Sequence, residues 1–355
     1  MQRFSRTSRT LALLGDSWVR GSGFPSTATG HAPTYFVPEL ARALRERFGD
    51  AGGGWCGLSY TTASDRRGGA AEPDRLSQAG TGNWRTNVRN QPTPDICTSM
   101  SDTPGDLIRV TWRGEATSAV VLHAFVGGAI NYRWNGGPWH GLTLGGIAGQ
   151  ARYGLTDFPT HGAWELDIAV AQGTVTLSGI EHRAEVPGKP GIRVHNLGAG
   201  GSTTADWLAA MRSGAWFAGA HSLGLDAAIL LLGTNDQRDF DARVYGQNLD
   251  AIVDRLRSQF PSLHLVLACS PENSGNEPQR RERPMTAYQD AAAKVAARHE
   301  LAIVDLQAAF GDVADYGLEG TRPLLDASRI HPNAAGSAVL RACMMDACLA
   351  LIDRI

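Results

Sequence analysis

Residues 226–236 read DAAILLLGTND, an apolar run that ends abruptly in a glycine and three polar residues. Residues 11–17 repeat the pattern as LALLGDS, and residues 191–202 repeat it as GIRVHNLGAGGS. Short apolar runs of this kind predict strands that are buried on both faces of a parallel sheet. Because ligands bind outside the carboxyl ends of the strands in open α/β sheets, the polar residues that follow these runs form the candidate site.

Helical segments separate these strands. Two further apolar runs, at residues 263–269 and 301–306, predict additional strands. The segments with the apolar spacing of amphipathic helices are residues 38–48, 204–214, 245–260, 285–300 and 333–352. Strands that alternate with helices predict a parallel sheet covered on both faces.

The part of the chain from residue 50 to residue 189 has a different pattern. It contains short β-rich runs separated by glycine-rich turns, such as Asn135-Gly136-Gly137, and it predicts an all-β sandwich. The runs are GGGWCGLSYTT, DLIRVTWRG, SAVVLHAFVGG, INYRWNGG, WELDIAVAQG and TVTLSGIEHRA. The polar, proline-containing residues 86–106 predict a loop. We therefore expect an α/β domain made of residues 1–49 and 190–355, interrupted by a β domain at residues 50–189.

The composition excludes several classes of protein. The chain has 355 residues and a net charge of -2, which argues against a basic nucleic-acid-binding surface. No apolar run approaches the ~18 residues of a membrane span, so the sequence predicts no transmembrane segment. The apolar stretch Leu11–Leu14 is too short for a signal peptide, which leaves a cytoplasmic, a mature secreted or a virion-associated location open.

The five cysteines are odd in number and have no CxxC spacing, so no zinc site or other metal centre is predicted. Cys56 and Cys97 are candidates for a disulfide, but buried free thiols are the preferred interpretation for the set.

Polar residues after the apolar runs have the chemistry of a serine-based acyl-transfer site. Ser17 needs a base to attack, because the pKa of a neutral serine hydroxyl is far too high. His331, just before the last helix, is a candidate for that base, and the Asn235 amide is a neutral donor for an oxyanion. Taken alone, GDS fits a helix cap better than a nucleophile. The clusters together, each at the edge of a strand or helix, favour catalysis.

These clusters resemble the conserved blocks of the SGNH, or GDSL-type, hydrolases, which are serine esterases on a flavodoxin-like α/β fold. The matching segments are GDS at 15–17, NLGAGGST at 196–203, GTND at 233–236 and IHPNAAG at 330–336. The resemblance implies that Ser17 is the nucleophile, that His331 is the base, and that the Ser17 and Gly201 N–H groups and the Asn235 side chain form the oxyanion hole. Asp16 and Gly200 are candidate substrate-binding residues, and the Gly201 assignment could shift by one position to Gly200.

One position departs from the family pattern. The family usually has an aspartate three residues before the histidine, and Ser328 stands there in this chain. Asp326, five residues before His331, is a candidate to orient the imidazole. A backbone carbonyl or the Ser328 hydroxyl are the alternatives, so the third member of the triad stays open.

The β section resembles the carbohydrate-binding-module-like insert of some peptidoglycan O-acetylesterases in this superfamily. Trp134 and Trp139 are candidates to stack on sugar rings, although core packing or contact with the main domain would also explain them. The resemblance implies an O-acetylesterase that acts on a polysaccharide such as peptidoglycan, capsule or xylan, without a metal or cofactor. A general esterase or lipase, an O-acyltransferase, and a glycan-binding structural protein with a degenerate site are the alternatives, and the oligomeric state is open.

Overall fold

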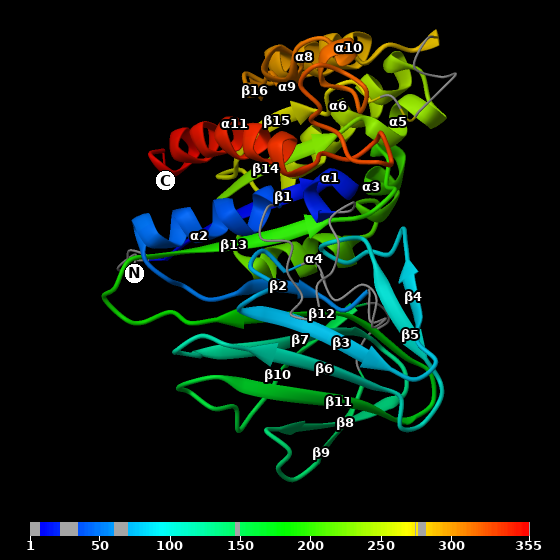
Figure 1. Ribbon diagram of the computed structural model, residues 1–355. Coiled ribbons are helices and arrows are strands. Elements are labelled where there is room, and N and C mark those ends of the chain that lie inside the picture. Colours follow the sequence, from blue (N-terminus) through cyan, green and yellow to red (C-terminus); the bar gives the residue numbers. More distant parts are fainter. Residues whose placement is uncertain are drawn as a thin grey trace.

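The computed structural model describes residues 8–21, 35–59, 70–145, 150–273, 275 and 282–354. A five-stranded parallel sheet lies at the centre of its α/β part (Figure 1). In spatial order the strands are β13 (Gly191–Gly198), β1 (Ser8–Gly15), β14 (Ala227–Leu232), β15 (His264–Cys269) and β16 (Ala302–Val304). With these strands counted along the chain, the order is the 2-1-3-4-5 of flavodoxin-like folds, which confirms the predicted α/β architecture.

Helices cover both faces of this sheet, because its central strands β1 and β14 have apolar residues on both sides. Ala12 and Leu14 of β1 face one helical layer, and Leu11 and Leu13 face the other. The first layer contains α3 (Thr204–Ala210), α4 (Gly214–Leu223), α6 (Ala242–Gln259) and α8 (Met285–Arg298). The second contains α1 (Ser17–Arg20), α2 (Phe36–Phe48), α9 (Leu306–Phe310) and α11 (Ala334–Ile352), with the short α10 (Val313–Tyr316) beside it. The short helix α5 (Thr234–Asp239) directly follows β14.

The helix expected at residues 204–214 is shorter than predicted, and a second helix that was not predicted follows it. α3 ends at Ala210, and α4 starts at Gly214. The Ser213 side chain accepts a hydrogen bond of 3.2 Å from the Ala215 N–H, so it caps the second helix.

Two antiparallel sheets lie beyond the parallel core, in the lower half of Figure 1. One has the order β10 (Gln150–Gly154), β7 (Ala119–Phe125), β12 (Val175–Arg183), β5 (Thr98–Ser101) and β4 (Arg85–Val88), with β2 (Gly54–Gly57) also paired to β12. The other has the order β3 (Leu76–Thr81), β6 (Leu107–Trp112), β11 (Trp164–Gln172), β8 (Ala129–Trp134) and β9 (His140–Thr143). Apolar residues of both sheets form one core.

The loop expected at residues 86–106 is wrong in part, because β4 and β5 lie in it. Both are short and pair with each other in antiparallel orientation, and Arg85 and Asn87 on β4 are exposed. A strand with so few apolar residues gives little periodic signal. The predicted Asn-Gly-Gly turn is present: Asn135 and Gly136 have φ values of +50° and +70°, and the Gly137 N–H donates to the Trp134 carbonyl.

The antiparallel sheets are in direct contact with the parallel sheet through β2. The Nδ1 atom of His195 on β13 accepts a hydrogen bond of 3.1 Å from the Trp55 N–H on β2. Gly54 allows this approach, because it has a φ of +70° and a Cβ there would lie 2.4 Å from the Val194 carbonyl oxygen. The indole of Trp55 belongs to the apolar core of the α/β part.

One described helix, α11, is long and apolar enough to cross a membrane by length and composition alone, which the sequence prediction did not anticipate. In this structure its buried side chains, among them Leu340, Met344 and Cys348, pack in the core next to α2 and α9. All five cysteines are free thiols and all but Cys343 are buried, which confirms the interpretation made from the sequence.

Candidate active site

Ser17 is the first residue of α1 and follows β1 after a sharp turn at Gly15 and Asp16. The Asp16 side chain caps the helix by accepting a hydrogen bond of 2.8 Å from the Trp18 N–H. Gly15 is required here, because a Cβ would lie 2.3 Å from the Leu231 carbonyl oxygen. The turn therefore places Ser17 at the carboxyl edge of the sheet, beside the boundary between β1 and β14 where the strand order reverses.

His331 reaches the same point from the opposite end of the chain. Its Nε2 atom lies 3.0 Å from the Ser17 Oγ atom, which is within the range for a nucleophile and its base. The ring comes from the segment just before α11, whose N-terminus is capped by the Asn333 side chain through the Gly336 N–H at 3.0 Å. The structure thus places Ser17 and His331 in contact, as their motifs alone had suggested.

The segment that carries His331 is a tight loop held by its own hydrogen bonds. The Asp326 N–H donates to the His331 carbonyl at 2.8 Å, and Leu325 and Pro332 form a β-bridge. Arg329 adopts a positive φ of +63°, an unusual conformation for a side chain of this size. This closure fixes the position of the imidazole relative to residues 326–328.

Within this loop, Ser328 lies between Asp326 and His331. The Ser328 Oγ atom is 3.2 Å from the His331 Nδ1 atom and donates a hydrogen bond to Asp326 Oδ1. Asp326 Oδ1 also accepts the Ser328 N–H at 3.0 Å. The serine at the family's usual aspartate position therefore occupies the place of the third triad member, next to the ring.

The second block, residues 196–203, lies directly against the Ser17 turn. The Ala199 N–H donates to the Gly15 carbonyl at 2.8 Å, and the Asn196 side chain accepts the Gly198 N–H at 3.0 Å. Gly201 follows with a φ of +75°, a conformation that favours glycine. Gly200 and Gly201 thus lie between Ala199 and Ser202, which both contact the Gly15 carbonyl, and their predicted roles at the site stay predictions.

Asn235 joins this group from α5. Its side-chain amide donates a hydrogen bond of 2.9 Å to the Ser202 carbonyl, which ties the third block to the second. The amide has a second hydrogen, and this is the donor that an oxyanion would require. Ser17, Gly201, Asn235 and His331 therefore come from four segments that meet at the carboxyl edge of the sheet.

Two buried carboxyl groups lie beneath this arrangement. Burial, helped by the nearby Asp236 carboxyl and opposed by the hydrogen bond from Trp18, raises the pKa of Asp16 to about 8. Burial raises the pKa of Asp236 to about 7, although hydrogen bonds from Thr204 oppose the effect. Both side chains are fully buried. The Asp16 carboxyl caps α1 and does not reach the solvent. Its predicted role in substrate binding stays a prediction.

Arg89, which the sequence did not single out, links the antiparallel sheets to the site. It follows β4, and its Nη1 atom donates a hydrogen bond of 2.8 Å to the Gly201 carbonyl and lies 3.5 Å from the Gly200 carbonyl. A Cβ on Gly201 would lie 2.7 Å from the same guanidinium atom. The contact depends on the loop conformation after β4, which no sequence pattern revealed.

The two candidate sugar-stacking tryptophans lie elsewhere, on or next to the outer sheet. Trp134 is buried, packs edge-on against Trp164 and donates from its indole N–H to the Thr156 carbonyl at 2.8 Å. Trp139 is 44% exposed, with the Arg133 guanidinium 4.3 Å from its ring centre. Figure 1 places β8 and β9 at the far end of the molecule from α1, so neither residue belongs to the Ser17 site.

His123 is a buried histidine outside the Ser17 site. Its ring is fully buried against Trp55, and neither ring nitrogen has a hydrogen-bond partner among the described residues. Burial lowers its pKa to about 3. His182 is also buried, and it accepts the Gly53 N–H at 2.9 Å.

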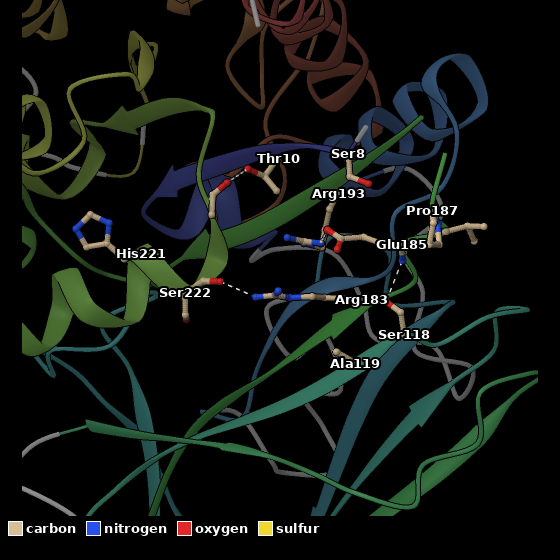
Figure 2. Close-up of a pocket in the computed structure, with 12 residues that line it drawn as sticks. Ser8, Thr10, Ser118, Ala119, Arg183, Glu185, Pro187, Arg193, His221 and Ser222 are labelled. Atoms are coloured by element: carbon tan, nitrogen blue, oxygen red, sulfur yellow. Dashed lines mark hydrogen bonds and ion pairs between the residues drawn. The ribbon is translucent and has the colours of Figure 1, made fainter. Parts of the chain in front are cut away.

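A cavity of about 590 Å³ lies between the parallel sheet and the antiparallel sheets (Figure 2). Its wall includes Ser8 at the start of β1, so it opens at the opposite end of this strand from Ser17. Arg193 pairs with Glu185 at 2.7 Å, and Arg183 pairs with Glu181 at 2.8 Å. These charges cancel, so the lining gives no preference for an anion or a cation.

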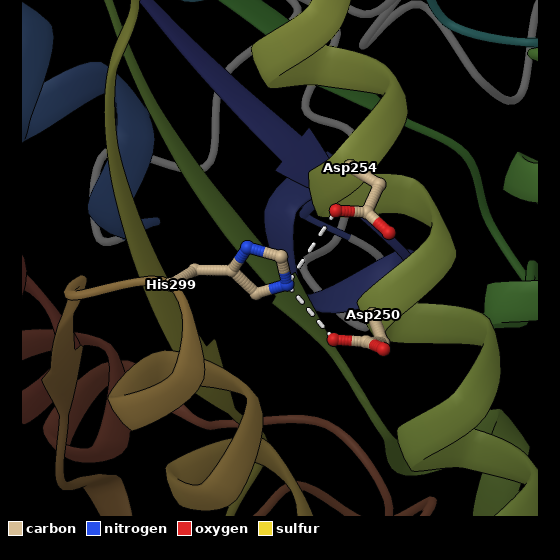
Figure 3. Close-up of side chains that lie close together, drawn as sticks. All are labelled: Asp250, Asp254 and His299. Carbon is tan, nitrogen blue, oxygen red and sulfur yellow. Dashed lines mark hydrogen bonds and ion pairs between the residues drawn. The ribbon is translucent and has the colours of Figure 1, made fainter.

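Asp250, Asp254 and His299 form a cluster between α6 and the end of α8 (Figure 3). The His299 Nε2 atom lies 2.8 Å from Asp250 and 3.9 Å from Asp254. Arg298 also pairs with Asp250. The cluster is explained as an ion-pair network that connects the two helices.

Comparisons with known proteins agree with this geometry. Residues 174–339 match a family model described as the GDSL-like Lipase/Acylhydrolase family. The chain contains a GDSL-like acylhydrolase domain. The matched part of this domain includes Gly201, Asn235 and His331, whereas Ser17 lies outside it, on the far side of the β section.

One solved structure shares the fold of this chain. A structure titled "Peptidoglycan O-acetylesterase in action, 5 min" is 17% identical, with a TM-score of 0.67, over 98% of this chain and 92% of that one. A family two carbohydrate esterase from Cellvibrio japonicus is 13% identical, with a TM-score of 0.33, over 79% of this chain and 98% of that one. The first shows that the fold is shared along nearly the whole chain. No curated protein sequence matches significantly.

Proposed function

We propose that the protein is a serine O-acetylesterase that removes acetyl groups from a polysaccharide through an acyl-Ser17 intermediate. The observation that carries the proposal is the distance of 3.0 Å between Ser17 Oγ and His331 Nε2 at the carboxyl edge of the sheet. The GDSL-like family match supports ester cleavage as the general reaction.

Acylation follows from the positions of these groups. Ser17 Oγ attacks the ester carbonyl carbon while His331 Nε2 takes the hydroxyl proton. The negative charge that develops on the carbonyl oxygen meets the backbone N–H groups of Ser17 and Gly201 and the Asn235 amide. When the tetrahedral intermediate collapses, the carbon–oxygen bond to the sugar breaks, and His331 gives its proton to the departing sugar oxygen, which leaves as a hydroxyl group.

Deacylation repeats these steps with water. His331 takes a proton from a water molecule that attacks the acyl-Ser17 carbonyl, and the same donors hold the second oxyanion. Acetate leaves, and Ser17 recovers its proton. No step uses a metal or a cofactor.

The carbohydrate substrate is supported by the β section. We propose that residues 50–189 form an inserted domain, carbohydrate-binding in character, within a catalytic domain of residues 1–49 and 190–355. Trp139 offers an exposed ring for a sugar, and Arg89 brings the same section to the rim of the Ser17 site. The structural neighbour titled as a peptidoglycan O-acetylesterase has the same overall fold.

The proposal is tested by measuring acetate release from acetylated peptidoglycan, acetylated xylan and an acetylated capsular polysaccharide, together with hydrolysis of 4-nitrophenyl acetate. We expect activity in the wild type, none in Ser17→Ala, and full activity in Ser258→Ala, a matched change at an exposed serine of α6. A wild type inactive on all of these esters would contradict ester hydrolysis. Hydrolysis of 4-nitrophenyl acetate without acetate release from any glycan would contradict the polysaccharide substrate.

A further inference from the structure

The hydroxyl group of Ser328 is surrounded by one acceptor and several donors. Its Oγ atom accepts from the Ile330 N–H at 3.2 Å and from the His331 N–H at 3.4 Å. The remaining neighbours are the Asp326 carboxylate and the His331 Nδ1 atom. A serine hydroxyl has one hydrogen to donate, so the direction of this hydrogen decides which ring nitrogen of His331 carries the proton.

The Asp326 carboxylate receives that hydrogen. Two oxygen atoms at hydrogen-bonding distance repel unless a proton lies between them, and a carboxylate has none to offer. Because the Ser328 hydrogen points to Asp326, the hydroxyl oxygen faces His331 Nδ1 as an acceptor. Nδ1 must then carry the ring proton, and Nε2 is left unprotonated toward Ser17, the tautomer that a general base requires.

We propose that Ser328 is a positioning residue that connects the Asp326 carboxylate to the catalytic imidazole. The chain of hydrogen bonds runs from Asp326 through Ser328 and His331 to Ser17. Ser328 selects the ring tautomer, and Asp326 polarises the Ser328 hydroxyl and stabilises the imidazolium formed during acylation. No proton leaves Ser328 or reaches Asp326 in this arrangement. The inference rests on the proposed role of His331 as the base.

The loop geometry supports this assignment. The β-bridge between Leu325 and Pro332 and the bond from the Asp326 N–H to the His331 carbonyl close the loop around Ser328. Asp326 is held by the Ser328 N–H as well as by its hydroxyl, so its carboxylate is fixed before the substrate arrives. Both side chains are accessible to solvent, so we expect an effect smaller than that of a buried triad aspartate.

The test compares kcat and KM for 4-nitrophenyl acetate in a set of folded variants. Ser328→Ala and Asp326→Asn should each lower kcat by about 10- to 100-fold with little change in KM. The double variant should be no slower than the slower single variant, because both changes interrupt one connection. Ser328→Thr, which keeps the hydroxyl, should recover most of the activity lost in Ser328→Ala.

An exchange variant separates positioning from simple stability of the loop. Asp326→Ser combined with Ser328→Asp places a carboxylate at the family's usual position, and we expect kcat within about tenfold of the wild type. Glu319→Gln is the matched control, since it removes an exposed carboxylate that pairs with Arg329 of the same loop. Its kcat should be unchanged. Melting temperatures confirm that each variant is folded.

The proposal is overturned if Ser328→Ala keeps its kcat within twofold of the wild type, or if the two single effects multiply in the double variant. A folded exchange variant as slow as Ser328→Ala would also overturn it. These outcomes require an active wild type that depends on Ser17, whereas an inactive wild type would contradict the proposed function itself.

Discussion

The guanidinium of Arg89 donates a hydrogen bond of 2.8 Å to the carbonyl of Gly201. Arg89 belongs to the antiparallel part of the chain, and Gly201 is a proposed oxyanion donor on the parallel part. The conformation of the loop that we propose as part of the oxyanion hole therefore depends on a contact between these two parts.

Loss of this contact should weaken catalysis without unfolding the protein. We expect Arg89→Ala to lower kcat for 4-nitrophenyl acetate by about 2- to 10-fold, the effect of one hydrogen bond of ~0.5–1.5 kcal/mol. Arg85→Ala, a change at another exposed arginine of the same β4 region, is the control and should leave kcat unchanged. Equal rates for Arg89→Ala and the control would show that the contact does not shape the site.

The Asn235 amide should contribute mainly in the transition state. We expect Asn235→Ala to lower kcat by about 10²- to 10³-fold with a small change in KM, because a lost oxyanion donor affects the charged intermediate more than the bound ester. Asn131→Ala on β8 serves as the remote control. A change confined to KM would instead indicate that Asn235 binds the substrate in its ground state.

Asp16 should make folding stability depend on pH. Its pKa is raised to about 8 in the folded protein, so between pH 4 and pH 8 the unfolded chain releases a proton that the folded protein keeps. The contribution of Asp16 to stability is therefore lost as the pH rises through this window. The melting temperature of Asp16→Asn should exceed that of the wild type by an amount that grows from pH 4 to pH 8. At pH 8 the difference in unfolding free energy should be on the order of a few kcal/mol.

The control for this prediction is Asp74→Asn, at an exposed carboxylate. Its melting temperature should follow the wild type at pH 4, 6 and 8. Parallel curves for Asp16→Asn and the wild type would contradict a raised pKa for Asp16.

Trp139 should affect glycan binding but not the chemistry. With Arg133 over the ring and 44% of the residue exposed, a sugar can stack on the open face. We expect Trp139→Ala to bind less to insoluble acetylated polysaccharide in a pull-down assay, while its kcat on 4-nitrophenyl acetate stays at the wild-type value. Val126→Ala, at another exposed apolar residue of the antiparallel part, should retain binding. Unchanged binding by Trp139→Ala would exclude this ring as a sugar platform.

Much of the α/β fold could be predicted from the sequence, because its strands are continuous apolar runs that end in polar blocks. β1, β13 and β14 lie where the runs LALLG, GIRVHNLG and AAILLL predict them. The strands β3, β4, β5, β9 and β10 were not predicted, because they are short and partly polar. Their position is set by pairing with neighbouring strands and not by their own periodicity.

The candidate site residues that lie in sequence motifs at strand ends could be predicted. The contacts that depend on the conformation of a loop could not. Ser17, Asn235 and His331 follow from their motifs, and the structure joins Ser17 to His331 and Asn235 to Ser202 of the second block. The hydrogen bond between Ser328 and Asp326 requires a loop in which Arg329 adopts a positive φ, and spacing alone does not reveal such a loop. The Arg89 contact likewise depends on how two distant segments pack.

The position of β1 in the parallel sheet has a consequence for the order of folding. Leu11 pairs with Val194 on one side and with Ala227 on the other, so the two neighbours of β1 lie 183 and 216 residues further along the chain. Pairs this distant in sequence form slowly, because the intervening chain must first be brought together. If the antiparallel part, residues 54–183, folds first, it brings the ends of this intervening segment together. That order of folding would shorten the time during which the Ser17 strand has unpaired edges open to aggregation.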